Sequence, residues 1–275
     1  MIALPIPRKL TQTRHQKQTP VSCPGGEVIY AEIKGAHIRL RVIAADGSGD
    51  RLLLPERDDW IQQHPAWSPD GRRLAFTGNE GFRNGQISVY ICEVDGLRCT
   101  GVRPLITPGQ NCWPAWSPDG KRLAYIGVSH QLMLADADGG NRRRPTSLAG
   151  IQFHPNWTPD GEWIVFASSH AGYFQVYKIR PDGRELTRLS RGDGYESRPA
   201  VSPDGRWVAY STRGLDGSGV VAAPIGGGEP IRITATDALD DYPSWSRDGS
   251  RLHFVSTRDG GFELYAVDPR ELLQR

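Results

Sequence analysis

The stretch Pro114-Ala-Trp-Ser-Pro-Asp-Gly120, followed directly by Lys-Arg-Leu-Ala-Tyr125, decides the fold of this chain of 275 residues. The same phrase recurs at Pro65–Gly71, Pro155–Gly161, Pro199–Gly205 and Pro243–Gly249, with a divergent copy at Pro20–Gly26. The closing glycines, which are Gly26, Gly71, Gly120, Gly161, Gly205 and Gly249, are separated by 45, 49, 41, 44 and 44 residues. A period near 45 that fills the whole length indicates six structural repeats.

Each repeat reads as four antiparallel strands. Ser-Pro-Asp-Gly predicts a tight turn, because Pro presets φ, Asp bonds to nearby backbone and Gly supplies a positive φ at the end. A short strand with Trp in a constant slot, assigned to packing between blades, precedes the turn, and an apolar triplet such as Leu123-Ala-Tyr125 follows it. A third and a more polar fourth strand complete the repeat, with Arg144–Leu148 as the least regular fourth strand. The sequence therefore predicts an all-β, six-bladed β-propeller of four-stranded blades, in one domain over residues 1–275.

The two ends of the chain predict how the ring closes. After the last third strand, Phe262–Val267, the remaining residues contain no good fourth strand. The segment Pro7-Arg-Lys-Leu-Thr11 is similar to the fourth strand Pro230-Ile-Arg-Ile-Thr234. We therefore expect residues 5–12 to form the outer strand of the sixth blade, which closes the ring and protects an open sheet edge.

The repeated Pro-x-Trp-Ser-Pro-Asp-Gly with its apolar triplet resembles the TolB-like propeller repeat, over about residues 5–268. This resemblance implies a non-enzymatic scaffold that binds a protein or peptide, as TolB proteins do in the periplasm. TolB proteins also carry an N-terminal α/β domain, of which the sequence shows no counterpart. Similar blades occur in prolyl oligopeptidase propellers and in oligogalacturonate lyases, so the fold does not decide the function.

The candidate site is a ring formed by the residues that directly precede the repeated prolines. The first strand of a propeller blade lines the channel, so these side chains are expected at the channel mouth, opposite the Ser-Pro-Asp-Gly turns. The set is Thr19, His64, Trp113, His154, Arg198 and Tyr242, with Asp241 and Glu196 nearby. Arg suits an anion and the aromatic side chains offer stacking surfaces, so the ring suits a peptide or a small anionic ligand. The alternative is that these residues face the water of a wet channel.

Catalytic and metal-binding signatures are weak. His64 and His154 lie one blade apart, and a metal would need a third ligand such as Asp241. Neither a Gly-x-Ser-x-Gly elbow nor a Gly-x-x-x-x-Gly-Lys-Ser/Thr phosphate loop occurs. The repeated turn aspartates are expected to cap backbone. We therefore expect no cofactor, metal or catalytic residue; the alternatives are a metal-assisted carbohydrate-active enzyme similar to oligogalacturonate lyases and the regulatory propeller of a larger polypeptide.

Charge and hydropathy narrow the class of partner. The chain has 33 Lys and Arg against 31 Asp and Glu, a balance that does not predict binding to nucleic acid or to an anionic membrane. The first residues show no secretory signal, and no apolar run approaches 18 residues. We expect a soluble, monomeric, cytoplasmic protein, or a periplasmic one if the chain is a trimmed form.

Two further features concern loops. Cys92 and Cys99 flank Asp95-Gly96; if those two residues form a hairpin loop, the thiols face each other, as a disulfide or as a packed apolar pair. The long loops opposite the Ser-Pro-Asp-Gly turns carry aromatic and arginine residues that suit a protein partner. These residues are Phe82, Tyr173, Phe262, Arg83, Arg213 and Arg258.

Overall fold

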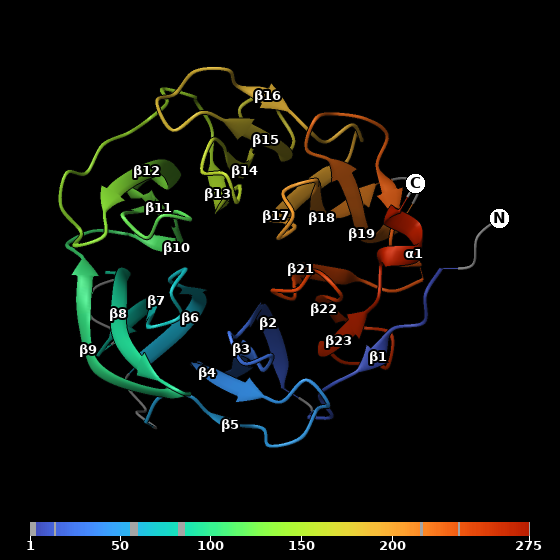
Figure 1. The fold of residues 1–275 in the computed structure, drawn as a ribbon, viewed down its shortest axis with the longest axis horizontal. Helices are drawn as coiled ribbons and strands as arrows, with labels where there is room; N and C mark the ends of the chain where they lie inside the picture. Colours follow the sequence, from blue (N-terminus) through green and yellow to red (C-terminus); the bar gives the residue numbers. More distant parts are fainter. Residues whose placement is uncertain are drawn as a thin grey trace.

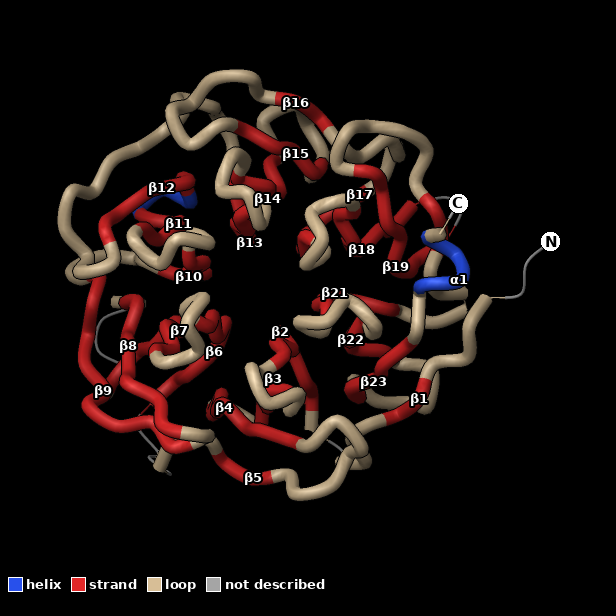
Figure 2. Tube along the Cα trace, in the orientation of Figure 1, coloured by secondary structure: helices blue, strands red, loops and turns tan. Residues whose placement is uncertain are grey.

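The computed structural model of the chain describes residues 4–13, 15–55, 60–81, 86–214, 217–235 and 237–274. Six antiparallel sheets stand around a central opening, one for each copy of the repeat (Figure 1). In each sheet the first strand faces this opening and later strands lie progressively outward (Figure 2). The structure thus confirms the six-bladed β-propeller. Within the described residues, no helix has the length and apolar character needed to cross a membrane.

The blades follow the chain in order. Blade one contains β2 (Gln16–Ser22), β3 (Val28–Lys34), β4 (His37–Ile43) and β5 (Arg51–Leu52), and blade two contains β6 (Trp60–Trp67), β7 (Arg73–Glu80), β8 (Ser88–Asp95) and β9 (Arg98–Ile106). Blade three contains β10 (Cys112–Trp116), β11 (Arg122–Gly127) and β12 (Gln131–Asp136), with the short helix η2 (Val128–His130) before β12. Blade four contains β13 (Gln152–Trp157), β14 (Ile164–Ser168), β15 (Gln175–Ile179) and β16 (Thr187–Arg188). Blade five contains β17 (Tyr195–Val201), β18 (Trp207–Gly214), β19 (Gly217–Pro224) and β20 (Ile231–Arg232). Blade six contains β21 (Asp240–Trp245), β22 (Leu252–Ser256), β23 (Glu263–Val267) and β1 (Arg8–Lys9), and helix α1 (Arg270–Leu273) follows it.

The repeated turn forms as the sequence predicts. In blade two, the Gly71 N–H donates to the Ser68 carbonyl at 2.9 Å, and Asp70 Oδ1 accepts from the Arg72 N–H at 3.1 Å. Gly71 has a φ of 70°, in the left-handed region that glycine tolerates. The turn aspartates Asp119, Asp160, Asp204 and Asp248 accept the equivalent backbone bond. The aspartates therefore serve their own turns. We call the side of the ring that carries these turns the turn face, and the opposite side the loop face.

The hydrophobic core consists of six clusters, one between each pair of neighbouring blades. Strand β7 shows the principle: Leu74 and Phe76 pack against blade one, whereas Ala75 packs against blade three. The repeated tryptophan always packs towards the preceding blade. It is Trp67, Trp116, Trp157 and Trp245 in blades two, three, four and six. The Trp slot therefore holds neighbouring blades together.

Blade three departs from the four-stranded prediction. The expected strand Arg144–Leu148 does not form, and only an isolated bridge joins Leu134 to Arg143. Pro145 has no backbone N–H to continue such a ladder. Instead, Arg144 Nη2 donates to the Leu148 carbonyl at 2.9 Å. The prediction of a fourth strand is wrong for this blade.

The hairpin between β8 and β9 is shifted by one residue from its expected register. Asp95 pairs with Arg98 and Val94 pairs with Cys99, which leaves Gly96 and Leu97 as the loop. Gly96 has a φ of 60°, and a glycine at the first loop position suits a tight hairpin. Cys92 and Cys99 therefore do not pair directly, and both thiols are free. Cys92 is part of the core and Cys99 packs against it.

The N-terminal segment closes the ring. Strand β1 pairs with β23, with Arg8 opposite Ala266 and Lys9 opposite Tyr265, at the outer edge of blade six (Figure 1). The Leu10 N–H donates to the Leu264 carbonyl at 2.8 Å, and the Leu10 side chain is buried between blades six and one. This pairing confirms the predicted closing strand.

A buried ion pair joins the same interface. The Lys17 side chain is 0% exposed, and its Nζ lies 2.9 Å from Glu263 Oε2. Lys17 Nζ also donates to the Thr13 carbonyl at 2.9 Å, and the Thr11 hydroxyl donates to Glu263 Oε2 at 2.5 Å. The pair thus ties the first strand of blade one to the third strand of blade six. Because both charges are buried, neither can lose its partner without a large cost.

Removing the closing segment is expected to destabilise the entire ring. A chain that begins at Thr13 loses the β1 pairing and Leu10, whose burial alone is worth about 2–5 kcal/mol. We expect the thermal midpoint to fall by about 5–20 °C in one cooperative transition, measured by calorimetry. A chain that begins at Pro7 is the control, because Ile6 is 93% exposed. Equal melting temperatures for the two shortened chains would contradict this closure.

Breaking the ion pair tests its contribution separately. Lys17→Met should lower the free energy of unfolding by about 3–5 kcal/mol, since it leaves the Glu263 carboxylate buried without its cation. Adding Glu263→Gln should restore part of this loss, because the second change removes the uncompensated charge. Urea unfolding of both single variants and the double variant measures the coupling. Strictly additive losses would show that the two side chains do not stabilise each other.

Candidate functional site

Every first strand contains an extra residue at the repeated proline. In blade two, Gln63 pairs with Thr77 and Ala66 pairs with Ala75, so that two residues face one on the neighbouring strand. This is a β-bulge, which bends a strand and redirects a side chain. The same irregularity occurs in the first strands of the other five blades. Proline fits the bulge because it has no N–H to leave unpaired.

The bulge holds the residue before each proline in the left-handed region. The φ angles are 48° at Thr19, 51° at His64, 50° at Trp113, 52° at His154, 55° at Arg198 and 55° at Tyr242. Such a conformation costs a non-glycine residue about 1–3 kcal/mol and persists only where the surroundings impose it. Six of the ten described non-glycine residues with a positive φ therefore occupy the positions that the sequence singled out, which we call the channel ring.

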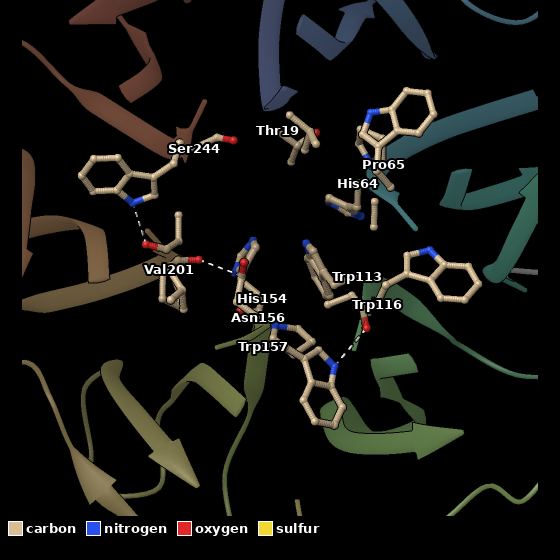
Figure 3. A pocket seen from close by; sticks show the side chains of 18 of the residues that line it. Thr19, His64, Pro65, Trp113, Trp116, His154, Asn156, Trp157, Val201 and Ser244 are labelled. Carbon is tan, nitrogen blue, oxygen red and sulfur yellow. Dashed lines mark hydrogen bonds between the residues drawn. The ribbon is translucent and has the colours of Figure 1, made fainter. Parts of the chain in front are cut away.

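The side chains of Thr19, His64, Trp113 and His154 point into the channel (Figure 3). The centroids of the His64 and Trp113 side-chain rings are 4.6 Å apart, and those of Trp113 and His154 are 4.9 Å apart. The centroid of the His154 imidazole also lies 6.3 Å from that of the Tyr242 ring and 6.4 Å from that of the His64 ring. Aromatic groups from blades two, three, four and six thus meet across the channel. They constrict it at the level of the bulges.

Burial keeps both ring histidines neutral. Burial lowers the pKa of His64 to about 3, and repulsion from Arg198 adds to this effect. The pKa of His154 is lowered well below its usual value by burial, by Arg198 and by His64. His64 Nδ1 lies 3.1 Å from Thr77 Oγ1, which also accepts the Trp113 N–H at 3.0 Å. The imidazoles therefore add polarity to the ring at neutral pH but no charge.

Asp241 lies behind the ring and positions Arg198. Its carboxylate lies 3.1 Å from Arg198 Nη1 and 2.7 Å from Arg213 Nη2. Ser211 Oγ and the Tyr242 N–H also donate to it, at 2.7 Å and 3.0 Å. The Arg198 guanidinium lies 4.2 Å from the centroid of the Tyr242 ring. One carboxylate therefore serves two guanidinium groups, which leaves an excess positive charge near the ring.

Glu196 is buried in the wall of blade five. Burial raises its pKa, and its Oε1 accepts the Gly192 N–H at 3.2 Å. Oε2 has no hydrogen-bond partner. Glu196 and Asp241 are both absent from the residues that line the channel cavity. The six ring residues line that cavity together, whereas the two acids stand outside it.

The cavity has a volume of about 700 Å³ and extends from the channel ring to the turn face. Its outer part is lined by Pro69, Pro159, Pro203 and Arg247, which belong to the repeated turns. The structure therefore differs from the expectation of a mouth on the loop face. The bulges direct these side chains inward, where they constrict the channel. The channel ring therefore forms the inner end of a cavity that extends to the turn face.

Sequence reasoning missed both the bulges and Arg247. A proline in the same slot of all six first strands was the signal for a bulge, since proline disrupts a regular ladder. Arg247 stands where the other turns have proline, and this exception was visible in the repeat. In the described part of the chain, no three His, Cys, Asp or Glu residues gather as a metal site would require.

Comparison with known proteins extends these observations. Residues 26–223 match the model of the TolB beta propeller domain. Over 161 residues the chain is 40% identical to the Tol-Pal system protein TolB of Bordetella pertussis, a match that covers 57% of the chain and 35% of that protein. The chain thus spans about a third of the length of the curated relatives that it matches first.

Solved structures share the fold. A putative TolB from Agrobacterium tumefaciens has a TM-score of 0.70 at 22% identity and covers 95% of this chain and 93% of its own. An oligogalacturonate lyase from Vibrio parahaemolyticus has a TM-score of 0.58 at 13% identity, covering 94% and 92%. At these identities the likeness concerns architecture alone. Because the family model matches most of the sequence, the chain belongs to the TolB β-propeller family.

Proposed function

We propose that the chain is a non-enzymatic scaffold that binds a protein partner on its loop face. The observation that carries this proposal is a set of exposed apolar side chains in the loop-face connections of blades three and four. Val128, Ile151 and Tyr173 are exposed, and all three lie in connections on the loop face. Tyr173 is 72% exposed. Exposed apolar groups that gather in one place commonly mark an interaction surface.

Aromatic rings extend this surface towards the channel. Phe153 and Phe174 stack with their centroids 5.3 Å apart, and Phe174 lies 5.2 Å from Tyr195. The Arg213 guanidinium lies 5.9 Å from the centroid of the Tyr195 ring. Aromatic and arginine side chains often provide the anchors of protein interfaces. We define the loop-face patch as Val128, Ile151, Phe153, Tyr173, Phe174 and Tyr195.

The other loop residues singled out by the sequence contribute less to this surface. Phe82 and Arg83 lie outside the described residues. Phe262 is half-buried, and its carbonyl accepts the Lys17 N–H at the ring closure. Arg258 is held by the buried Asp240 carboxylate at 2.9 Å. Of these loop residues, Tyr173 belongs to the patch and Arg213 borders it.

One comparison supports a binding role. The Bordetella relative is named a Tol-Pal system protein. We extend the proposal to a periplasmic location, which the likeness to TolB implies. Recovery of the chain with the cytoplasmic fraction after osmotic shock would contradict that location.

Disrupting the patch should abolish partner capture without unfolding the ring. In Ile151→Ser/Tyr173→Ser, loss of apolar contact area should reduce capture at least about tenfold, because central interface residues dominate binding energy. The melting temperature should stay within about 2 °C of the parent, since both side chains are exposed. Affinity capture from the source cells, followed by quantitative mass spectrometry, measures the loss.

Leu186→Ser is the matched control, because Leu186 is an exposed apolar residue near the outer strand of blade four. A protein that is captured by this control and the parent but lost from the double variant is the expected partner. Arg198→Ala and Tyr242→Ala report on the channel ring. Capture that depends on these two ring residues and survives the double variant would overturn the loop-face proposal.

A further inference from the structure

The repeated turn of blade six departs from the pattern in one residue. Five copies have proline at the second position of the turn, namely Pro24, Pro69, Pro118, Pro159 and Pro203. Blade six has Arg247 there, although its turn keeps the same backbone bond between the Gly249 N–H and the Ser246 carbonyl. Proline favours this turn position by presetting φ, and arginine does not. The turn therefore forms without the proline, and the arginine side chain is free to serve another purpose.

The Arg247 side chain reaches across the turn-face end of the channel. Its Nη2 donates to the Ser68 carbonyl of blade two at 3.4 Å, past the intervening blade one. Burial lowers the pKa of Arg247, and Cys23 partly opposes this effect. Within the described residues, no carboxylate forms an ion pair with this guanidinium. A long weak bond to one neutral carbonyl leaves most of its donors available.

The cavity beyond Arg247 is mostly apolar along its walls and positive at both ends. Prolines, alanines, valines and the repeated tryptophans form most of the walls, and Asn156 and Ser244 are polar exceptions. Arg198 stands at the inner end, where Asp241 is shared with Arg213. Of the described lining residues, none is Asp, Glu or Lys, and the two histidines are neutral. The volume of about 700 Å³ lies within the range of small-molecule pockets.

We propose that the turn-face cavity binds an organic carboxylate, with Arg247 as the anchor of the carboxylate and the apolar walls around its body. A guanidinium pairs with a carboxylate through two parallel hydrogen bonds, which a neutral carbonyl cannot match. The carboxylate belongs either to a free small molecule or to the C-terminus of a peptide. Both sources present the same group to Arg247.

This site is separate from the proposed loop-face interface. Contacts such as those of His154 with His64 and Tyr242 constrict the channel between the two. Changes in the loop-face patch should therefore leave carboxylate binding unaltered, and changes at Arg247 should leave partner capture unaltered. The two proposals can fail independently.

Isothermal titration calorimetry with matched probes tests the site. N-acetylphenylalanine should bind the parent chain, and its amide, N-acetylphenylalaninamide, should bind at least about tenfold more weakly because it lacks the charge. Arg247→Pro restores the residue of the other turns, so it should fold as stably as the parent and lose at least about tenfold in affinity for the acid. Arg206→Ala is the control, since Arg206 is an exposed arginine of the adjacent turn, paired with Asp204 at 2.7 Å. It should bind as the parent does.

Peptides distinguish the two sources. A ten-residue peptide that ends in phenylalanine with a free carboxylate should bind at least about tenfold more tightly than N-acetylphenylalanine if the natural ligand is a chain end. Equal or weaker binding assigns the site to a free small carboxylate. The amidated peptide should bind more weakly in either case. Equal affinity for acid and amide, unchanged affinity in Arg247→Pro, or no binding of any probe would overturn the proposal.

Discussion

The fold depends on the interface between the last blade and the first, which are not consecutive in the chain. Blades six and one are joined by strand β1, by Leu10 in the cluster between them and by the buried pair of Lys17 and Glu263. Because the hydrophobic clusters join each blade to its two neighbours, an open interface here would leave two blades each with one unpacked side. The shape of the channel also depends on this closure. Side chains as far apart in the chain as His154 and Tyr242 meet on its axis because the ring is complete.

Closure also explains how the channel ring tolerates its backbone strain. Six non-glycine residues with positive φ would destabilise an isolated strand by about 1–3 kcal/mol each. Each bulge lies between paired residues on both sides, and in blades two, three, four and six the packed tryptophan follows it. The side-chain rings of His64 and Trp113, for example, have centroids 4.6 Å apart, and His64 Nδ1 and the Trp113 N–H both contact the Thr77 hydroxyl. The blades therefore impose the conformation that aims these side chains inward.

The repeat predicted the architecture well because its signals are local. Each signal can be read within a short segment: the turn chemistry, the Trp slot, and the pattern that Pro7–Thr11 shares with Pro230–Thr234. The structure confirms the fold and the closing strand that these signals predict. Details that depend on strand register were harder to predict from the sequence. Gly96 takes the first loop position and shifts the pairing of the hairpin that carries Cys92 and Cys99, and blade three, with Pro145, lacks its fourth strand. The direction of the cavity depends on which side chains meet across the channel. That is a property of the closed ring, which spacing along the chain does not reveal.

A single carboxylate connects the two sides of the channel ring. Asp241 holds Arg198, which lines the cavity, and Arg213, which borders the loop-face patch through Tyr195. It cannot fully compensate both guanidinium groups, so each draws on the same negative charge. Each guanidinium therefore keeps part of its positive charge, Arg198 on the side of the cavity and Arg213 on the side of the loop face. Because the Asp241 carboxylate is nearly inaccessible to water, its attraction to the mostly buried Arg198 is weakly screened. Asp241 thus fixes the position of Arg198 from behind the channel ring, without itself lining the cavity.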